Sequence, residues 1–290
     1  MRRLSKSTYA EFYWWGCNPG FIVSKDGVAL VDTPQQPIDA MRWREMITDR
    51  FGPIRCIINT EPHWDHTYGN QFFQGVQVIA HEGVAARYAS VLESHSGPTA
   101  KVNQVELMKQ DDPDSYYLAT NPAYPPNPAA RTFTDRLELE LGEHKIVLEN
   151  WPGHTKPQTH VLLPEEGIVF TGDNIFHQCM SWLQECDPWE WIETLKKMKR
   201  FEGVYVPGHG EPCTKAYLQE QIEIVHAWLD AVGAFVRRGL TEDEAIREKM
   251  PKVDPWPLAQ RLHEWEPAVY ERSIRNLHKL IIARESGAKR

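Results

Sequence analysis

The chain of 290 residues lacks features that several classes of protein require. It has only five cysteines, an odd number, and no CxxC pair, which argues against a disulfide framework and against a cysteine-type structural zinc site. No apolar run approaches the roughly 18 residues of a membrane span. The basic start of the chain is not followed by the apolar segment of a secretory signal peptide. We therefore expect a cytoplasmic protein with no membrane partner.

The chain also has fewer basic than acidic residues. Lys and Arg total 32 against 40 Asp and Glu, for a net charge of −8, so the chain lacks the cationic face that a nucleic-acid partner would need. Apolar residues make up 41% and charged residues 25%, which excludes wholesale disorder. The length fits one large α/β domain or a domain with an appendage. The 11 tryptophans are many for this length and indicate an aromatic-lined pocket or an aromatic core.

Strand and helix patterns alternate through the first two thirds of the chain, which predicts a layered α/β fold. A hairpin is expected around the turn 24–27, whose Asp-Gly pair favours a tight turn. Helices are predicted at 37–51 and 188–201, and strands at 21–23, 28–31, 56–59, 76–80, 137–141, 145–150, 159–163, 168–171 and 203–206.

Two regions depart from this alternation. Residues 83–132 contain an acidic cluster and a proline-rich run, and we expect a long, irregular, lid-like insertion. From residue 214 the strand patterns stop, and a capping box at 241–244 and a further helical segment at 267–284 follow. The first tail helix is predicted from an apolar stripe at spacings of four and three, formed by Leu218, Ile222, Val225, Leu229, Val232 and Val236. We therefore predict a catalytic domain over 1–213 and a helical extension over 214–290. The stripe would be buried on that domain or on a twofold partner in a homodimer.

The strongest chemical signal is the run Asn59-Thr60-Glu61-Pro62-His63-Trp64-Asp65-His66, which directly follows an apolar strand. Side chains alternate in extended backbone, so Glu61, His63 and Asp65 can project to one side, with His66 one step further on. Two imidazoles and two carboxylates at a strand end form a metal-site pattern. The alternative is a solvated turn that happens to be rich in histidine and acid.

Three later segments favour the metal site over that alternative. Each places one histidine or aspartate beside glycine directly after a predicted strand: His154 in 151–155, Asp173 in 170–174 and His209 in 206–210. Glycine at such a position lets the backbone bend sharply or approach a ligand closely. Ligands collected from several strand ends are what a catalytic metal site on an α/β scaffold requires.

With these segments in order, the chain resembles the metallo-β-lactamase superfamily. The family pattern is His-x-His-x-Asp-His, then a Gly-His-Thr histidine, a Gly-Asp aspartate and a Pro-Gly-His histidine, and the resemblance covers roughly residues 10–213. It implies a four-layer αββα sandwich with a metal pair at one sheet edge. It also implies ligand roles: His63 and His154 for a first metal, Asp65, His66 and His209 for a second, and Asp173 as the bridge.

Glu61 departs from that pattern, because it stands where the first histidine of the family motif usually sits. A carboxylate can still ligate through oxygen, but it makes the cluster one unit less positive than histidine would. We therefore expect Glu61 to be a ligand, with either a weaker first site or a less acidic metal-bound water. The alternatives are an enzyme that uses only the second metal, and a Glu61 that points away or hydrogen-bonds a ligating histidine. The expected cofactor is zinc, as one or two ions, with iron or manganese as alternatives.

The resemblance implies a hydrolase that uses a zinc-activated water, with Asp65 as the catalytic residue that orients the water or moves its proton. The expected partner is a small-molecule substrate with an ester, lactone, thioester or amide carbonyl. Arg272, Arg275 and Lys279 are weak candidates to bind an anionic glutathione thioester. Aromatic density favours an apolar or aromatic substrate, and the expected contacts are Trp14, Trp64, Trp182, Trp189 and His177, with a core role as the alternative for most of them. Displacement on an activated aromatic carbon, an iron-dependent oxidase and a non-catalytic relative remain as other functions.

Overall fold

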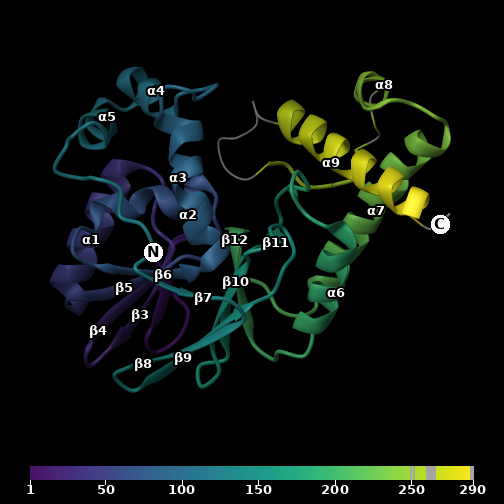
Figure 1. Ribbon diagram of the computed structural model, residues 1–290. Coiled ribbons are helices and arrows are strands. Elements are labelled where there is room, and N and C mark those ends of the chain that lie inside the picture. The colour runs from purple at the N-terminus through teal and green to yellow at the C-terminus, as the bar shows by residue number, and fades with distance from the viewer. Residues whose placement is uncertain (249, 251, 259–265, 288–290) are drawn as a thin grey trace. The chain divides into compact units, whose positions relative to one another are not determined.

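The computed structural model describes residues 1–248, 250, 252–258 and 266–287, and its helices and strands are drawn in Figure 1. The chain has a mixed α/β fold with two sheets and a set of C-terminal helices, as predicted. It divides into two compact units. Unit 1 comprises residues 1–151 and 157–172, and unit 2 comprises residues 152–156 and 173–290. The division falls inside strand β11 (Ile168–His177).

The first sheet lies in unit 1 and has seven strands in sequential order. Strands β1 to β4 pair antiparallel, and β4 to β7 pair parallel. The predicted hairpin is present, and its turn is closed by Gly27, whose φ of 126° suits a residue without a side chain. The strands are β1 (Arg2–Arg3), β2 (Thr8–Ala10), β3 (Gly20–Ser24), β4 (Gly27–Val31), β5 (Ile54–Ile58), β6 (Gln77–His81) and β7 (Arg131–Phe133).

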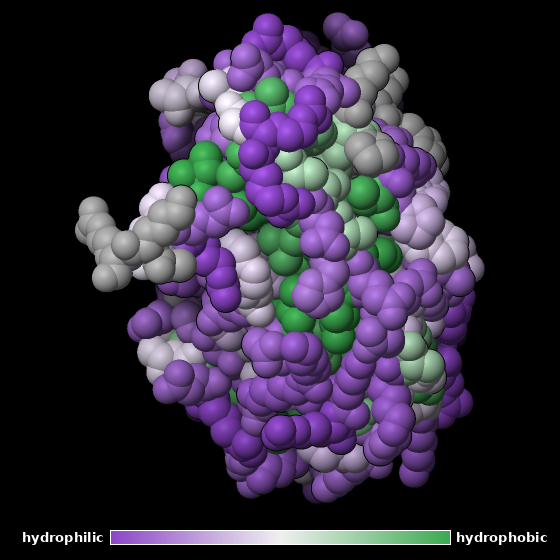
Figure 2. Space-filling view, turned by 90° about the vertical axis from the view of Figure 1, so that its right-hand side faces the viewer, coloured by the Kyte–Doolittle hydropathy of each residue, from purple (hydrophilic) through white to green (hydrophobic). Residues whose placement is uncertain are grey.

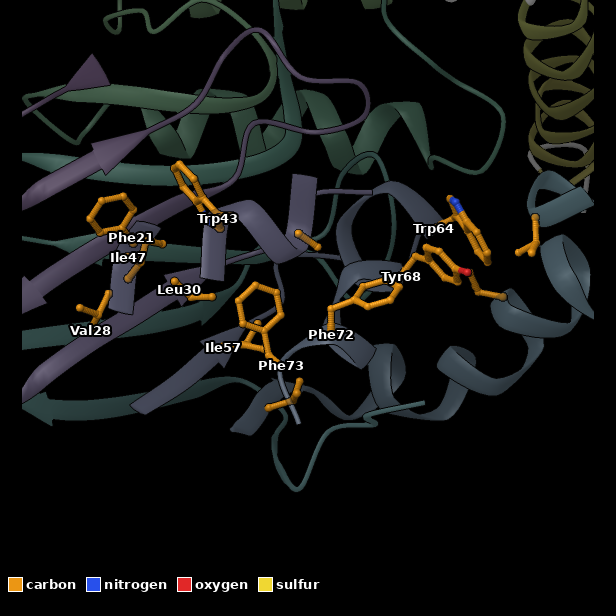
Figure 3. Close-up of a cluster of buried hydrophobic side chains, with 14 of the residues drawn as sticks. Phe21, Val28, Leu30, Trp43, Ile47, Ile57, Trp64, Tyr68, Phe72 and Phe73 are labelled. Carbon is orange, nitrogen blue, oxygen red and sulfur yellow. The ribbon is translucent and has the colours of Figure 1, made fainter. Parts of the chain in front are cut away.

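Helix α1 (Pro37–Phe51) connects β4 to β5, and it begins with proline, whose fixed φ suits the first helical turn. Its buried face places Trp43 and Ile47 in the core of unit 1, where Phe21 of β3 meets the Trp43 ring edge-on. Figure 3 shows this cluster continuing to Trp64 and Tyr68, whose rings stack with centroids 3.6 Å apart. The short helices α2 (Trp64–Thr67) and η1 (Tyr68–Phe72) carry that end of the cluster. The core therefore extends to the segment that bears the predicted metal ligands.

The expectation of an irregular insertion over 83–132 was wrong for most of that range. It contains helices α3 (Glu82–Ser96), α4 (Gln104–Asp111) and α5 (Pro113–Ala119), and residues 97–103, 112 and 120–130 have neither helix nor strand. The acidic cluster that looked irregular includes the N-cap of α5, since the Asp112 side chain accepts a hydrogen bond from Ser115 N at 3.1 Å. Val105 and Met108 of α4 are buried in the core, so packing orders helices too short to be stable alone.

The second sheet has five strands in the order β12-β11-β10-β9-β8. Its strands are β8 (Arg136–Leu141), β9 (His144–Asn150), β10 (Thr159–Leu163), β11 and β12 (Val204–Gly210), and β8 to β11 pair antiparallel. Within unit 1 the two sheets pack tightly, because a Cβ added at Gly20 of β3 would lie 2.2 Å from the ring of Phe170 on β11.

Unit 2 holds the end of β11, strand β12 and helices α6 (Pro188–Met198), α7 (Leu218–Arg237), α8 (Glu242–Arg247) and α9 (Glu266–Gly287). The predicted capping box joins Thr241 and Glu244 at the start of α8. Four residues of the predicted stripe on α7 are buried, whereas Leu229 and Val236 are half-buried. Figure 2, which views the molecule from the side that carries α6, α7 and α9 in Figure 1, shows apolar residues gathered among hydrophilic ones. Among the described residues, no helix is long and apolar enough to cross a membrane.

The predicted domains do not coincide with the two compact units. The helical extension from residue 214 lies in the same unit as His154, Asp173 and His209, which come from the predicted catalytic domain. The tail and three of the predicted ligands are therefore packed together.

Candidate metal centre

The ligand motif of unit 1 begins where β5 ends. Asn59 continues the pairing of the strand, with its N–H donated to the Ile79 carbonyl at 3.0 Å, and the chain then turns into α2. The turn buries the Glu61 and His66 side chains completely, whereas His63 and Asp65 are partly exposed. The turn after this parallel strand therefore brings the polar side chains of the motif close together.

Glu61 lies at the centre of this group. Its Oε1 is 2.6 Å from His63 Nδ1 and 3.3 Å from His66 Nε2, while His66 Nε2 is also 3.7 Å from Asp65 Oδ2. All four predicted ligands of the motif are therefore brought together within unit 1. Glu61 points to the same place as the two histidines, as its position in the sequence led us to expect.

Asp32 forms hydrogen bonds with His66 and with the neighbouring Thr60. Its Oδ2 lies 2.9 Å from His66 Nδ1 and accepts the Thr60 hydroxyl at 2.6 Å, and its Oδ1 accepts the Thr60 N–H at 2.8 Å. Donation of Nδ1–H to a carboxylate leaves the lone pair of His66 on Nε2, the atom that faces Glu61 and Asp65. Asp32 adopts φ 56°, which is unusual for a residue with a side chain.

Sequence reasoning did not predict Asp32 or Cys17 as members of this site. Ligand atoms of Cys17, Asp32 and His66 lie within 4.8 Å of one another, all of them buried. Burial raises the pKa of the Cys17 thiol to about 12. The Asp-Thr pair at 32–33, placed directly after a strand, was the only signal available for Asp32.

In unit 2, Asp173 stands between two histidines. Its Oδ2 is 3.8 Å from His154 Nε2 and 3.5 Å from His209 Nε2, and all three side chains are nearly buried. A single carboxylate oxygen therefore faces two imidazole nitrogens. These three predicted ligands are thus brought together although they come from separate segments of the chain.

In unit 2, hydrogen bonds that involve backbone groups orient His154, and ring stacking orients His209. His154 donates its N–H to Asn174 Oδ1 at 3.0 Å, and its Nδ1 lies 2.8 Å from the Trp182 carbonyl. Since a carbonyl only accepts, His154 carries its proton on Nδ1 and presents the lone pair of Nε2 toward Asp173. The approach needs glycine at 153, because a Cβ there would lie 2.0 Å from Asn174 Oδ1. The His209 ring stacks on Phe176, with centroids 5.7 Å apart and planes inclined by 5°.

The predicted substrate-contacting residues fall into different environments. Trp64 is 4% exposed and stacks between Tyr68 and His95, so it lies in the core of unit 1. Trp14 is half-buried and packs edge-on against Trp43 in the same unit.

In unit 2, Trp182 and Trp189 are half-buried, and the Arg284 guanidinium covers the Trp189 ring at 4.2 Å. His177 lies 2.7 Å from the Glu211 carbonyl through Nδ1 and packs against the Tyr217 ring. Trp182 is thus the one aromatic of this set that both remains partly open and belongs to the loop that contacts a predicted ligand.

The side chains present suit a divalent metal. Imidazole nitrogen and carboxylate oxygen are ligands that zinc and iron both bind. In unit 1 the ligand atoms of Glu61 and His63 lie within 4.8 Å of each other, as do those of Asp65 and His66. In unit 2 the same holds for His154 and Asp173. Each unit therefore carries a group of metal-type donors.

Comparison with known proteins assigns the chain to a family. The model of the metallo-beta-lactamase superfamily matches residues 12–209, more than half of the chain. A hydroxyacylglutathione hydrolase from Maricaulis maris (strain MCS10) is 25% identical over 203 residues, which cover 67% of this chain and 62% of that protein. The chain thus spans less than two thirds of the length of this relative.

Solved structures share the fold at lower identity. A metallo-beta-lactamase family protein from Thermus thermophilus matches with a TM-score of 0.67 at 19% identity, over 97% of this chain and 94% of that one. A metallo-beta-lactamase from Pontibacter korlensis matches with a TM-score of 0.58 at 17% identity, over 78% of this chain and 97% of that one. The first of these matches extends over most of the C-terminal helices as well.

Proposed function

Because the chain belongs to the metallo-beta-lactamase superfamily, we propose that it is a metal-dependent hydrolase that cleaves a small-molecule ester, lactone, thioester or amide. The observation that carries the proposal is the convergence of metal-type donors in each unit. Four come from the motif after β5, and the other three are Asp173 and the two histidines that face its Oδ2. Burying polar or charged side chains costs free energy unless they are paired or bind a cation. The clustering of several such side chains in each unit therefore supports a metal site.

The family pattern supports a two-metal ligand set. We propose that one ion is held by Glu61, His63 and His154 and the other by Asp65, His66 and His209, with Asp173 shared by both. Zinc bound in such a site lowers the pKa of water from about 15.7 toward about 7 and polarises a substrate carbonyl. The tautomers of His66 and His154 suit this role, because each carries its proton on Nδ1 and offers Nε2.

Asp65 is our candidate for moving the proton of the attacking water. Its side chain is 24% exposed, whereas Glu61 and His66 are fully buried, so Asp65 can reach both the donors and a bound substrate. A carboxylate at that point can accept the water proton and deliver it to the leaving group. The fixed positions of the surrounding side chains reduce the reorganisation needed in the transition state.

The charge of the substrate can be argued from the cationic side chains of the C-terminal helices and from one relative. The Maricaulis maris relative is a hydroxyacylglutathione hydrolase, which makes a glutathione thioester one candidate. Arg275, one of the expected cationic contacts, is already engaged with Asp243 at 2.9 Å and Glu271 at 3.1 Å. An uncharged or aromatic substrate that contacts Trp182 therefore fits the chain better than an anionic thioester.

The test is metal dependence measured on a small panel of substrates. Chelated protein should lose hydrolysis of a nitrophenyl ester, an aromatic lactone, S-lactoylglutathione or nitrocefin, and added zinc should restore it. Elemental analysis of protein produced without added zinc separates zinc from iron. Full activity after exhaustive chelation, with no metal detected, would show that the proposal is wrong.

A further inference from the structure

The loop of residues 179–187, named here the support loop, joins the end of β11 to the start of α6 and has no regular structure. It lies entirely in unit 2 and is largely buried, so its backbone polar groups need partners other than water. The partners come from the C-terminal extension.

The first half of the support loop is held by α7 and by the segment before α9. Met180 donates its N–H to the Pro257 carbonyl at 2.7 Å, and Ser181 donates its own to Asp254 Oδ2 at 2.8 Å. The Gln221 side chain of α7 donates to the Ser181 hydroxyl, also at 2.8 Å. Ser181, Gln221 and Asp254 are each 0% exposed, so water does not compete for these hydrogen bonds.

The second half is held by α9. Leu183 donates its N–H to the Ser273 hydroxyl at 3.2 Å, and the Asn276 amide donates to the carbonyls of Leu183 at 2.7 Å and Cys186 at 2.9 Å. Hydrogen bonds to the extension therefore flank residue 182 on both sides. The Trp182 carbonyl between them accepts from His154 Nδ1 at 2.8 Å.

We propose that the C-terminal helices position the metal ligand His154 through the support loop, with Ser273 and Asn276 as positioning residues. This inference rests on the proposed function in one respect, the role of His154 as a ligand. Hydrogen bonds between α9 and the loop fix the Trp182 carbonyl, which holds the proton of His154 on Nδ1 and turns Nε2 toward Asp173. The extension is thus part of the site and not a separate module.

The test uses Asn276→Leu, which removes both amide donors and keeps the branched shape of the side chain, and Ser273→Ala, which removes the hydroxyl. Nitrogen-15 NMR of the metal-free full chain, with the ring assigned through His154→Gln, reads the tautomer directly. We expect one Nδ1–H tautomer in the wild type and a mixture of tautomers in both variants. Zinc titration should then show one site weakened about 10- to 100-fold, as is usual when a group that orients a ligand is lost.

The matched control is Val232→Ala on α7, whose buried side chain packs in the same unit and makes none of the hydrogen bonds to the support loop. It should lower the melting temperature without changing the tautomer or the affinity for zinc. If Asn276→Leu and Ser273→Ala behave like this control, the positioning role is refuted. Since the tautomer is read without metal, a wild type that binds no divalent metal would refute the proposed function and leave the NMR result to decide on positioning.

Discussion

The two units supply metal-type side chains in opposite ways. Unit 1 takes four donors from six consecutive residues, 61–66, and orients His66 with the Asp32 carboxylate. Unit 2 takes three donors from segments that are 19 and 36 residues apart, and orients His154 with a backbone carbonyl. A local motif such as residues 61–66 is visible in a sequence. Dispersed ligands held by carbonyls depend on the packing of the surrounding chain.

The largest effect should come from Asp173, because the geometry of unit 2 is centred on its Oδ2. Asp173→Ala should reduce hydrolysis by more than the roughly 100-fold typical of losing an orienting group, and should lower the content of bound metal. Activity and elemental analysis are the measurements. Glu165→Ala, at an exposed position in the turn before β11, is the control and should leave both unchanged. Equal metal content in the two variants would remove Asp173 from the ligand set.

Two tryptophans distinguish core packing in unit 1 from an open surface in unit 2. Trp64→Ala should cost about 3–5 kcal/mol of unfolding free energy, because a buried, stacked ring is lost. Trp182→Ala should cost less stability, since its side chain is half-buried, and should instead raise KM. Denaturant unfolding and steady-state kinetics separate the two outcomes. A large stability loss at Trp182 with unchanged kinetics would assign it to the core.

Asp32 tests the side-chain anchor of unit 1. Asp32→Asn keeps the shape and tolerates the left-handed backbone, but it replaces one of the two accepting oxygens with an NH₂ group, which accepts no hydrogen bond, so the carboxylate that Thr60 and His66 share is lost. We expect metal affinity to fall about 10- to 100-fold, measured by competition with a chelator. The control is Asp26→Asn in the exposed turn between β3 and β4. An unchanged affinity would mean that Asp32 does not orient His66.

Substitutions at Glu61 should give the smallest effect. They test unit 1 at the position where it departs from the family pattern. Glu61→His should keep the fold and tighten binding of the first zinc, since imidazole nitrogen replaces a hard carboxylate oxygen. Glu61→Ala should lower occupancy of one metal position only. Metal stoichiometry of the wild type and both variants, measured beside turnover, tests this. Identical metal content and affinity in all three would show that Glu61 is not a ligand.

Local patterns in the sequence predicted much of the fold. The hairpin at 20–31, helix α1 with its initial proline and the capping box of α8 all depend on neighbouring residues, so they could be read directly. The convergence of Glu61, His63 and His66 was also predictable, because strand alternation and the short helix α2 place residues two to five apart on one side.

The tertiary structure decided what depends on distant partners. Helix α4 is short and ordered by burial of Val105 and Met108, whereas the buried residues of α3, Val84, Tyr88 and Val91, recur at helical spacing, a signal that sequence reasoning missed. The anchor of His154 was invisible for a more basic reason: any residue at position 182 would supply the same carbonyl. Only the packing of the support loop against residues of α7 and α9 brings that oxygen to Nδ1, since hydrogen bonds between segments some 90 residues apart require the folded chain.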